Sequence, residues 1–286
     1  MSRIAYVDGR YVPLGEPAIA IQDRGYQFAD GVYEVIPVLG GRLVDAPRHL
    51  RRLERSLGEL RIPAPLSGGA LSVVMAEVLR RNRVRDGLLY LQISRGVARR
   101  EHPFPARARP VLVVTARPGP GFPEDLDAWA VAAITHPDQR WARCDIKSIA
   151  LLPNVLARQA AREAGAYEAI LLDGAGMVTE GAASTVWVVD AAGVLRTRPL
   201  DWAILPGCTR EALLACLAES NLAFAERAVS VEELRTAREI FLTSATSYVR
   251  PVIRLDGAPV GEGKVGPVAR ALHALLRRAL VGEEAG

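Results

Sequence analysis

The sequence predicts an α/β fold with two mixed α/β domains joined by a short linker. Apolar runs of strand length alternate with segments whose apolar residues recur at a helical period. The 286 residues allow one large domain or two medium ones, at roughly 100–200 residues each. The segment Arg117–Pro123 holds three prolines and two glycines in seven residues, which suits neither a helix nor a central strand. We therefore place a small N-terminal domain at 1–117, a linker at 118–124 and a larger C-terminal domain at 125–286.

The N-terminal domain begins with strands and then mixes helices with strands. Asp8-Gly9 and Gly40-Gly41 are turn dipeptides between apolar runs, and each predicts a tight hairpin. Asp45 precedes a segment in which leucines recur every three or four residues, so we expect it to cap a helix. The predicted strands are 4–7, 10–12, 32–39, 42–44, 88–94 and 110–115, and the predicted helices are 46–60 and 69–82.

The C-terminal domain shows the same mixture of patterns. Short apolar runs bounded by turn residues predict strands, and longer stretches with a helical period predict helices. The predicted strands are 129–135, 168–172, 185–189 and 239–243, and the predicted helices are 152–164, 208–219 and 266–281.

Composition excludes several classes of partner. The 36 basic and 32 acidic residues nearly cancel, and no basic block alternates with aromatic residues, so we predict no nucleic-acid partner. The three cysteines are too scattered for a disulfide framework, which favours a cytoplasmic location. The four histidines lack the spacing of metal ligands, so no metal is predicted. No apolar stretch approaches the ~20 residues of a membrane span, and we expect neither a membrane partner nor a signal peptide.

Lysine is rare in this chain. Only Lys147 and Lys264 occur, beside 34 arginines (36 basic residues minus two). Arginine stays protonated, whereas a lysine can lose its proton and attack a carbonyl to form a Schiff base. Lys264 lies in a glycine-rich loop, where a solvated charge is the simpler interpretation. Lys147 lies in a polar stretch before a predicted helix, and it is equally consistent with a Schiff-base lysine and with a chance survivor of codon bias.

Glu180 is a carboxylate between two apolar strands, followed by a glycine that permits close approach of a ligand. Buried carboxylates usually have a partner, and a pyridinium nitrogen would be a suitable one. An ordinary turn carboxylate explains the same residues and is favoured when Glu180 is considered alone.

Two further segments contain groups that suit a phosphate. Gly207 and a capping Thr209 precede a predicted helix, whose first N–H groups attract anions, although a simple helix cap explains the same residues. The hydroxyl-rich run Thr243–Ser247 follows an apolar strand and is either a second phosphate contact or a solvated loop.

Arg100 and His102 alternate in the loop Arg99–Pro105 and would point the same way in an extended segment. Such a pair suits a carboxylate ligand. An exposed polar loop is an equally good interpretation of these residues alone.

The order of these segments along nearly the whole chain resembles the fold-type IV pyridoxal-phosphate enzymes, and among them the D-amino acid transaminases (D-alanine aminotransferases). The matching runs are Asp23–Glu34, His49-x-x-Arg52-Leu53, Arg95-Gly96, Arg100-x-His102, Arg143–Ser148, Val178–Gly181, Gly207-x-Thr209-Arg210 and Thr243-Ser244-x-Thr246-Ser247.

The resemblance implies two domains with the active site between them, pyridoxal 5'-phosphate as cofactor, and a cytoplasmic homodimer. It implies that Lys147 holds the cofactor as a Schiff base, the internal aldimine, and shuttles a proton. Glu180 would pair with the pyridine nitrogen. The other implied cofactor-binding residues are Arg52, Leu205, Cys208, Thr209, Ser244, Ala245 and Thr246. The implied substrate-binding residues are Tyr33, Arg100 and His102, with Arg100 and His102 contributed across the dimer interface.

The implied reaction is ping-pong transamination between D-amino acids, such as D-alanine or D-glutamate, and 2-oxo acids. The alternatives on the same fold are a branched-chain L-amino acid transaminase and a lyase of the aminodeoxychorismate lyase type. A cofactor-binding protein without turnover is a further alternative, which retention of Lys147 opposes. Arg100-x-His102 opposes the branched-chain alternative.

The chain departs from the family pattern at four positions. Ala182, Ala183 and Thr185 stand where the family commonly has a serine-rich stretch that ends in Ser-Asn, which removes hydroxyls near Glu180. Arg250, after the hydroxyl-rich run, is also unusual. It is either a determinant of side-chain preference or a surface arginine.

Overall fold

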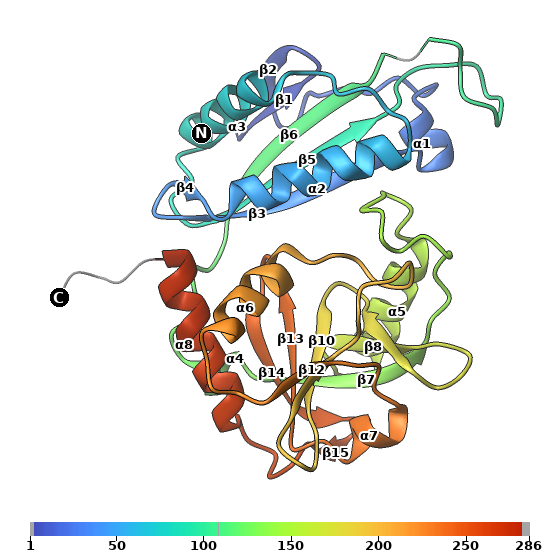
Figure 1. Ribbon diagram of the computed structural model, residues 1–286. Coiled ribbons are helices and arrows are strands. Elements are labelled where there is room, and N and C mark those ends of the chain that lie inside the picture. The colour runs from blue at the N-terminus through green and yellow to red at the C-terminus, as the bar shows by residue number, and fades with distance from the viewer. Residues whose placement is uncertain (1–2, 108, 282–286) are drawn as a thin grey trace. The chain divides into compact units, whose positions relative to one another are not determined.

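Figure 1 shows the computed structural model of the chain, which describes residues 3–107 and 109–281. The chain forms two compact units, and each combines helices with a sheet, which confirms the predicted α/β class. The first unit comprises Met1–Gly121 and Ile146–Ala150, and the second comprises Phe122–Asp145 and Leu151–Gly286. Lys147 therefore packs with the first unit, although it follows the predicted linker in sequence.

The first unit is an antiparallel six-stranded sheet in the order β2-β1-β6-β5-β3-β4. Its elements are β1 (Ile4–Val7), β2 (Arg10–Pro13), α1 (Arg24–Phe28), β3 (Gly31–Leu39), β4 (Arg42–Leu43), α2 (Ala46–Glu59), α3 (Gly68–Asn82), β5 (Gly87–Ser94) and β6 (Val111–Pro118).

One face of this sheet is covered by α2 and α3, and the alternation of side chains along β3 decides which residues it buries (Figure 1). Val32 and Ile36 are fully buried against the helices, as are Leu89 and Leu91 of the neighbouring β5. Successive residues of a strand point to opposite faces, so Tyr33 lies on the face away from these helices. The even-numbered residues of β3 thus build the core, and Tyr33 is left to line the other face.

The second unit is built on a mixed nine-stranded sheet in the order β12-β11-β10-β13-β14-β7-β8-β9, with β15 beside β14. Its elements are α4 (Leu126–Trp129), β7 (Val131–Pro137), α5 (Leu152–Glu163), β8 (Glu168–Leu172), β9 (Val178–Gly181), β10 (Thr185–Val189), β11 (Leu195–Thr197), α6 (Cys208–Ala218), β12 (Phe224–Glu226), α7 (Val231–Arg235), β13 (Glu239–Ser244), β14 (Tyr248–Leu255), β15 (Ala258–Pro259) and α8 (Pro267–Val281).

The central strands β10 and β13 of this sheet are buried along their full length apart from Ser244. Trp187 and Phe241 are both inaccessible, and their rings stack with centroids 5.9 Å apart. Both strands were predicted because a short uninterrupted apolar run, 186–189 in β10 and 240–242 in β13, is typical of a strand buried on both faces. The amino end of β10 (Thr185) pairs with Thr243, next to the carboxyl end of β13 (Ser244), so these residues lie at the same edge of the sheet.

The structure corrects three details of the predicted elements. β6 continues through Arg117 to Pro118, so the first residue of the predicted linker belongs to a strand. Pro118 pairs with Gly87 at the end of the ladder, where a proline is tolerated. Asp45 precedes α2 but makes no capping hydrogen bond, because its carboxylate accepts from Arg48 (2.9 Å). The strand predicted from residue 129 begins at Val131, since the short helix α4 comes first.

No helix among the described residues is both long and apolar enough to cross a lipid bilayer. Within the same residues, no group of three or more His, Cys, Asp or Glu side chains is arranged to hold a metal ion.

Candidate active site

Lys147 lies on a segment that extends the sheet of the first unit at the edge of β3. The Tyr33 N–H donates to the Lys147 carbonyl (3.0 Å), and the Ile149 N–H donates to the Gly31 carbonyl (3.1 Å). β4 pairs only with the far end of β3, which leaves the near end open to this segment. Backbone pairing therefore fixes the position of Lys147, even though the lysine is distant in sequence from β3.

The Lys147 side chain lies beside Tyr33, so the structure brings two of the predicted residues together. The Nζ atom is 4.2 Å from the centroid of the Tyr33 ring. The Lys147 N–H also donates to Ser56 Oγ of α2 (3.3 Å). An ammonium over an aromatic face is held by cation–π attraction, which favours one orientation of a flexible chain. The amine is thus placed on the face of the sheet that α2 and α3 leave uncovered.

Arg52, on α2, is held by a buried carboxylate that sequence reasoning did not single out. Its Nε and Nη2 atoms donate to the two carboxylate oxygens of Glu34 (2.7 and 2.8 Å). His49 Nδ1 contacts the same carboxylate (2.8 Å), and Glu34 is completely buried. Burial alone would raise the pKa of Glu34, but the charge and hydrogen bonds of Arg52 lower it to about 2. The Arg52 guanidinium is therefore held in a fixed orientation by an ionised Glu34.

Glu34→Gln is expected to destabilise the protein at neutral pH by about 3–5 kcal/mol, because it leaves the buried Arg52 charge without its counter-ion. A carboxyl with a pKa near 2 in the folded state and 4.5 in the unfolded state stabilises the fold fully above pH 4.5. This contribution is lost as the pH falls from 4.5 to 2. The difference in unfolding midpoint between wild type and Glu34→Gln should therefore shrink over that range.

Glu77→Gln is the matched control for this measurement. Glu77 also pairs with two arginines, Arg80 and Arg81, but on the outer surface of α3. Solvent screens exposed pairs, so its loss should leave the midpoint nearly unchanged. Equal losses in the two variants would contradict the role of burial at Glu34.

Arg100 and His102 are both exposed and lie on the loop that follows β5. The Arg100 guanidinium carbon is 5.1 Å from the Phe28 ring centroid, and the ring centroids of His102 and Phe28 are 5.7 Å apart. Phe28 ends α1, and the side chains of Arg100 and His102 both contact its ring. Arg100 and His102 thus lie beside the same phenylalanine ring of the first unit.

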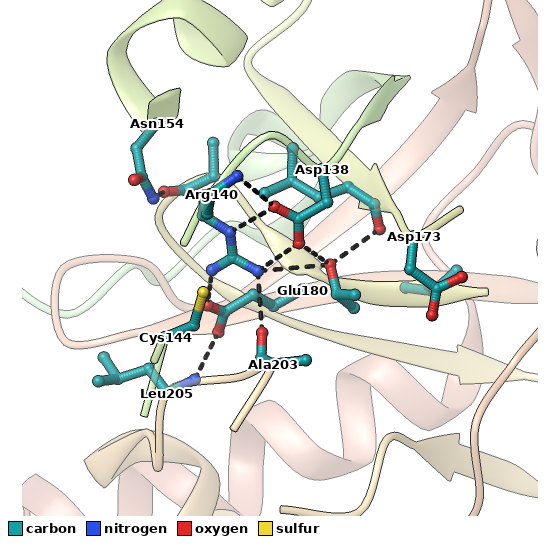
Figure 2. Close-up of polar contacts among 12 residues, drawn as sticks. Asp138, Arg140, Cys144, Asn154, Asp173, Glu180, Ala203 and Leu205 are labelled. Carbon is teal, nitrogen blue, oxygen red and sulfur yellow. Dashed lines mark hydrogen bonds and ion pairs between the residues drawn. The ribbon is translucent and has the colours of Figure 1, made fainter. Parts of the chain in front are cut away.

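In the second unit, Glu180 lies on β9 and is held from two sides (Figure 2). One carboxylate oxygen pairs with Arg140 Nη1, and the other accepts the Leu205 N–H (3.1 Å). Arg140 also donates to both carboxylate oxygens of Asp138 (2.9 and 2.7 Å) and to the Ala203 carbonyl (3.0 Å). The structure thus brings Glu180 and Leu205 together through a network centred on Arg140.

Charges and hydrogen bonds in this network shift the pKa values of Asp138 and Arg140 toward their ionised forms. Burial alone would raise the pKa of Asp138, but hydrogen bonds from Arg140 and Thr179 lower it. Burial would lower the pKa of Arg140, and its bond to Asp138 and the charge of Glu180 hold it above the ordinary value. Burial raises the pKa of the adjacent Cys144 thiol to about 12, so Cys144 is a neutral packing residue at physiological pH.

Cys208 and Thr209 are buried in the first turn of α6, and Gly207 precedes the helix. No side chain caps α6, so the predicted capping role of Thr209 is wrong; it is the second residue of the helix. A Cβ on Gly207 would lie 3.0 Å from Thr185 Oγ1, and Thr185 pairs with Thr243. The start of α6 therefore lies beside the end of β13.

β13 ends at Ser244, and Ala245 and Thr246 follow it in the turn before β14. The hydroxyl oxygens of Ser244 and Thr246 are 3.5 Å apart, and Ser244 Oγ accepts the Ser247 N–H (3.1 Å). Ser244 and Ala245 are partly buried, and Thr246 is exposed. Because Thr185 adjoins both segments, the second unit brings the two predicted phosphate contacts to one place.

The departure at Ala182 has a structural explanation. Ala182 is buried in an apolar cluster with Ala157 and Ala161 of α5, where a small apolar side chain packs without a hydrogen-bond requirement. Ser184 keeps its hydroxyl but donates it to the buried carboxylate of Glu168 (2.9 Å). Ala182 and Ser184 thus stabilise the connection between β9 and β10, Ala182 by packing and Ser184 by a buried hydrogen bond.

Arg250 is not a free surface arginine, because it is partly buried between two aromatic rings. Its guanidinium carbon lies 3.8 Å from the ring of Trp129 and 3.9 Å from the ring of Tyr167. Trp129 Nε1 donates to the Ser247 carbonyl, and the Tyr167 hydroxyl contacts Ser247 Oγ. The stacked arginine therefore supports the end of the hydroxyl-rich loop.

Comparisons with known proteins agree with the arrangement of these residues. A family model for class IV amino-transferases matches residues 31–255. A D-alanine aminotransferase of Bacillus licheniformis is 41% identical over 278 residues, which cover 97% of each chain. A D-alanine aminotransferase of Staphylococcus haemolyticus is 38% identical over 269 residues, which cover 94% of each. The chain belongs to the class IV aminotransferase family and is an aminotransferase.

Solved structures of the same fold include branched-chain enzymes. The branched-chain amino acid aminotransferase of Escherichia coli superposes with a TM-score of 0.88 at 25% identity, over 100% of this chain and 97% of that one. A hypothetical aminotransferase of Mycobacterium tuberculosis in a PLP-bound form superposes with a TM-score of 0.83 at 26% identity, over 97% and 99%. The fold is thus that of the fold-type IV aminotransferases.

Proposed function

We propose that the protein transfers amino groups between D-amino acids and 2-oxo acids, with pyridoxal 5'-phosphate as its cofactor. The relatives with 36–41% identity over 94–97% of the chain are D-alanine aminotransferases, and this supports D-alanine as a first substrate. The observation that carries the D-specific assignment is the placement of Arg100 and His102 over one aromatic ring, where together they suit a carboxylate.

The residues present fit pyridoxal phosphate. Lys147 supplies an amine beside Tyr33, and Glu180 supplies a nearly buried carboxylate that Arg140 and the Leu205 N–H hold in place. The start of α6 and the Ser244–Thr246 loop offer N–H and hydroxyl groups at one place, which suits a phosphate. Arg52, in the first unit, is the cation that the resemblance implies for the phosphate, and Glu34 fixes its orientation.

The cofactor, when bound, supplies an electron sink for the negative charge left on the substrate Cα. Lys147 would attach the cofactor and then, as the free amine, move the proton to and from Cα. Glu180 would keep the pyridine nitrogen protonated, because a carboxylate there favours the charged ring. Tyr33, Arg100 and His102 would hold the substrate carboxylate, so that the Cα–H of the D-enantiomer faces Lys147.

The second candidate is a branched-chain L-amino acid aminotransferase. It is favoured by the high TM-scores to branched-chain enzymes, but these structures share only 24–26% identity with the chain. The fold is common to both activities, so the substrate must be decided by the site residues. Arg100 and His102 support the D-specific alternative.

We also propose a cytoplasmic homodimer, as the resemblance implies, with Arg100 and His102 reaching the partner's substrate. Several apolar side chains near the loop are exposed, which is typical of a surface that another subunit covers. Those with the greatest exposure are Ile21 and Tyr26 at 79%, Phe104 at 51% and Val97 at 50%.

Mixing the cofactor-loaded protein with D-alanine, without a 2-oxo acid, should bleach the visible absorbance of the lysine-bound cofactor. Pyruvate should appear in step with pyridoxamine phosphate, and L-alanine should leave the absorbance unchanged. These results would follow from a half-reaction restricted to the D-enantiomer. Bleaching by L-leucine and not by D-alanine would instead favour the branched-chain candidate. Turnover of an aminated chorismate derivative to pyruvate without a 2-oxo acid would favour a lyase.

A further inference from the structure

The loop that presents Arg100 and His102 is held by one buried arginine, Arg24. Its Nη1 atom donates to the Glu101 carbonyl (2.6 Å), and its Nη2 atom donates to the His102 carbonyl (3.2 Å). The Arg24 side chain is only 4% exposed. A single guanidinium therefore binds the backbone of the short segment between the two cationic side chains.

Arg24 is itself fixed by a carboxylate that it shares with a second buried arginine. Its Nε atom donates to Asp30 Oδ2 (2.8 Å), and Arg95 donates to both oxygens of Asp30 (2.7 and 2.9 Å). Arg95 continues to the carbonyls of Leu60 (2.7 Å) and Arg61 (3.1 Å) after the end of α2. We call these three residues the Arg24–Asp30–Arg95 triad. It forms a continuous chain of contacts from the end of α2 to the loop.

The charges of the triad are arranged to remain ionised in the interior. Two arginines face one carboxylate, and each arginine also donates to two backbone carbonyls. Burial alone would raise the pKa of Asp30, but the hydrogen bonds of Arg95 and Arg24 lower it. An ionised carboxylate between two guanidinium groups prevents either arginine from moving without breaking charge-assisted bonds.

Phe28 connects the triad to the exposed cations. The Arg24 guanidinium carbon lies 4.7 Å from the Phe28 ring centroid, close to the distances at which Arg100 and His102 contact the same ring. Arg24 thus holds the loop backbone, while Phe28 supports the two side chains that the loop presents. The positions of the loop backbone and of these two side chains therefore both depend on α1, which contains Arg24 and Phe28.

We propose that Arg24 is a positioning residue, which sets the distance and direction of Arg100 and His102 for recognition of the substrate carboxylate and so contributes to discrimination between enantiomers. This inference rests on the proposed function. Recognition of a carboxylate by an arginine and a histidine needs a fixed geometry, and a displacement of about 1 Å can cost on the order of 100-fold in catalysis. Lysine could supply the charge of Arg24 but not the planar guanidinium whose separate nitrogens reach Asp30, Glu101 and His102 at once.

The test compares Arg24→Lys with the wild type. We expect the KM of D-alanine to rise by about 10- to 100-fold, with kcat lowered by less than about threefold, because the loss is in carboxylate binding. The inhibition constant of propionate, a carboxylate without an amino group, should rise in parallel. The ratio of D-alanine to L-alanine turnover should fall, and amide hydrogen exchange across 97–106 should become faster.

Asn82→Ala is the matched control, because it destabilises the same unit far from the loop in sequence. Asn82 joins α3 to β1 through hydrogen bonds to both the N–H and the carbonyl of Ile4 (2.8 Å each). This variant should lose stability but keep the wild-type KM and the wild-type ratio of enantiomers. A merely structural role for Arg24 predicts that the two variants behave alike.

Phe28→Leu keeps the test decisive if Arg24→Lys fails to fold. It leaves the triad intact and removes the ring under Arg100 and His102, so the KM and the propionate constant should rise in the same way. Wild-type values in either folded variant would overturn the inference. A wild-type protein that reacts with no D-amino acid would instead overturn the proposed function, which separates the two failures.

Discussion

Lys147→Ala should lower kcat for transamination by about 10⁴-fold or more, because it removes both the covalent attachment of the cofactor and the base that moves the Cα proton. The folded state should survive. Lys147 is partly exposed, and pairing at the edge of β3 uses the backbone, which the substitution leaves in place. Steady-state kinetics with D-alanine and a 2-oxo acid would measure the loss. Borohydride reduction of the wild type should fix the cofactor on the peptide that contains Lys147.

Lys147→Arg is the control that separates charge from chemistry. It keeps a cation that can lie over the Tyr33 ring, but a guanidinium does not become a free amine at physiological pH. We expect it to be as inactive as Lys147→Ala. Added methylamine should partly restore activity to the alanine variant, which leaves space for a small amine, and not to the arginine variant. Wild-type activity in Lys147→Ala would overturn the whole catalytic assignment.

The lysine could be found from sequence because this chain uses arginine for almost every other positive charge. That signal is compositional and does not depend on the fold. The structure adds what composition lacks, namely that the segment joins the edge of β3 and lies against α2. A segment that follows the predicted linker but packs with the first unit has no local pattern that reveals it.

Strands built around uninterrupted apolar runs were predicted well, whereas β14, which has polar interruptions, and the short strands β9, β11, β12 and β15 were not predicted. β8 and β10 have the predicted bounds, Glu168–Leu172 and Thr185–Val189, because both are buried on both faces. β14 contains two arginines and Pro251, a residue that usually excludes a central strand. Its pairing with β7 begins only at Val252, so Pro251 lies beyond that ladder. Whether Pro251 is tolerated depends on where β7 begins to pair with β14, and the sequence of β14 alone does not show that.

The partners of the predicted site residues were missed for a related reason. Arg140 is 40 residues from Glu180, and Glu34 is 18 residues from Arg52. Helical and strand periods relate only near neighbours, so neither ion pair leaves a local signal. The rule that a buried carboxylate needs a partner could have prompted a search, but it does not identify which of 34 arginines supplies the charge.

Glu180→Gln should lower kcat by on the order of 10²- to 10³-fold, while cofactor attachment to Lys147 persists. Glutamine has nearly the shape of glutamate, and its carbonyl oxygen can still accept the Leu205 N–H. It lacks the negative charge that would keep a pyridine nitrogen protonated, so the electron sink is weakened without loss of the site's shape. The absorbance spectrum of the bound cofactor should shift, which reports on the ring directly and does not depend on turnover.

Asp138→Asn is the matched control, because it removes a negative charge from the same Arg140 without touching Glu180. Asp138 accepts three hydrogen bonds from Arg140, one of them from its backbone N–H, and one from Thr179 (2.6 Å), so its loss perturbs the network about as much. If Glu180 acts on the cofactor ring, Asp138→Asn should keep the wild-type spectrum and most of kcat. If the network as a whole sets the rate, the two variants should lose activity equally. That second outcome would assign the function to Arg140 and would contradict a direct role for the Glu180 charge.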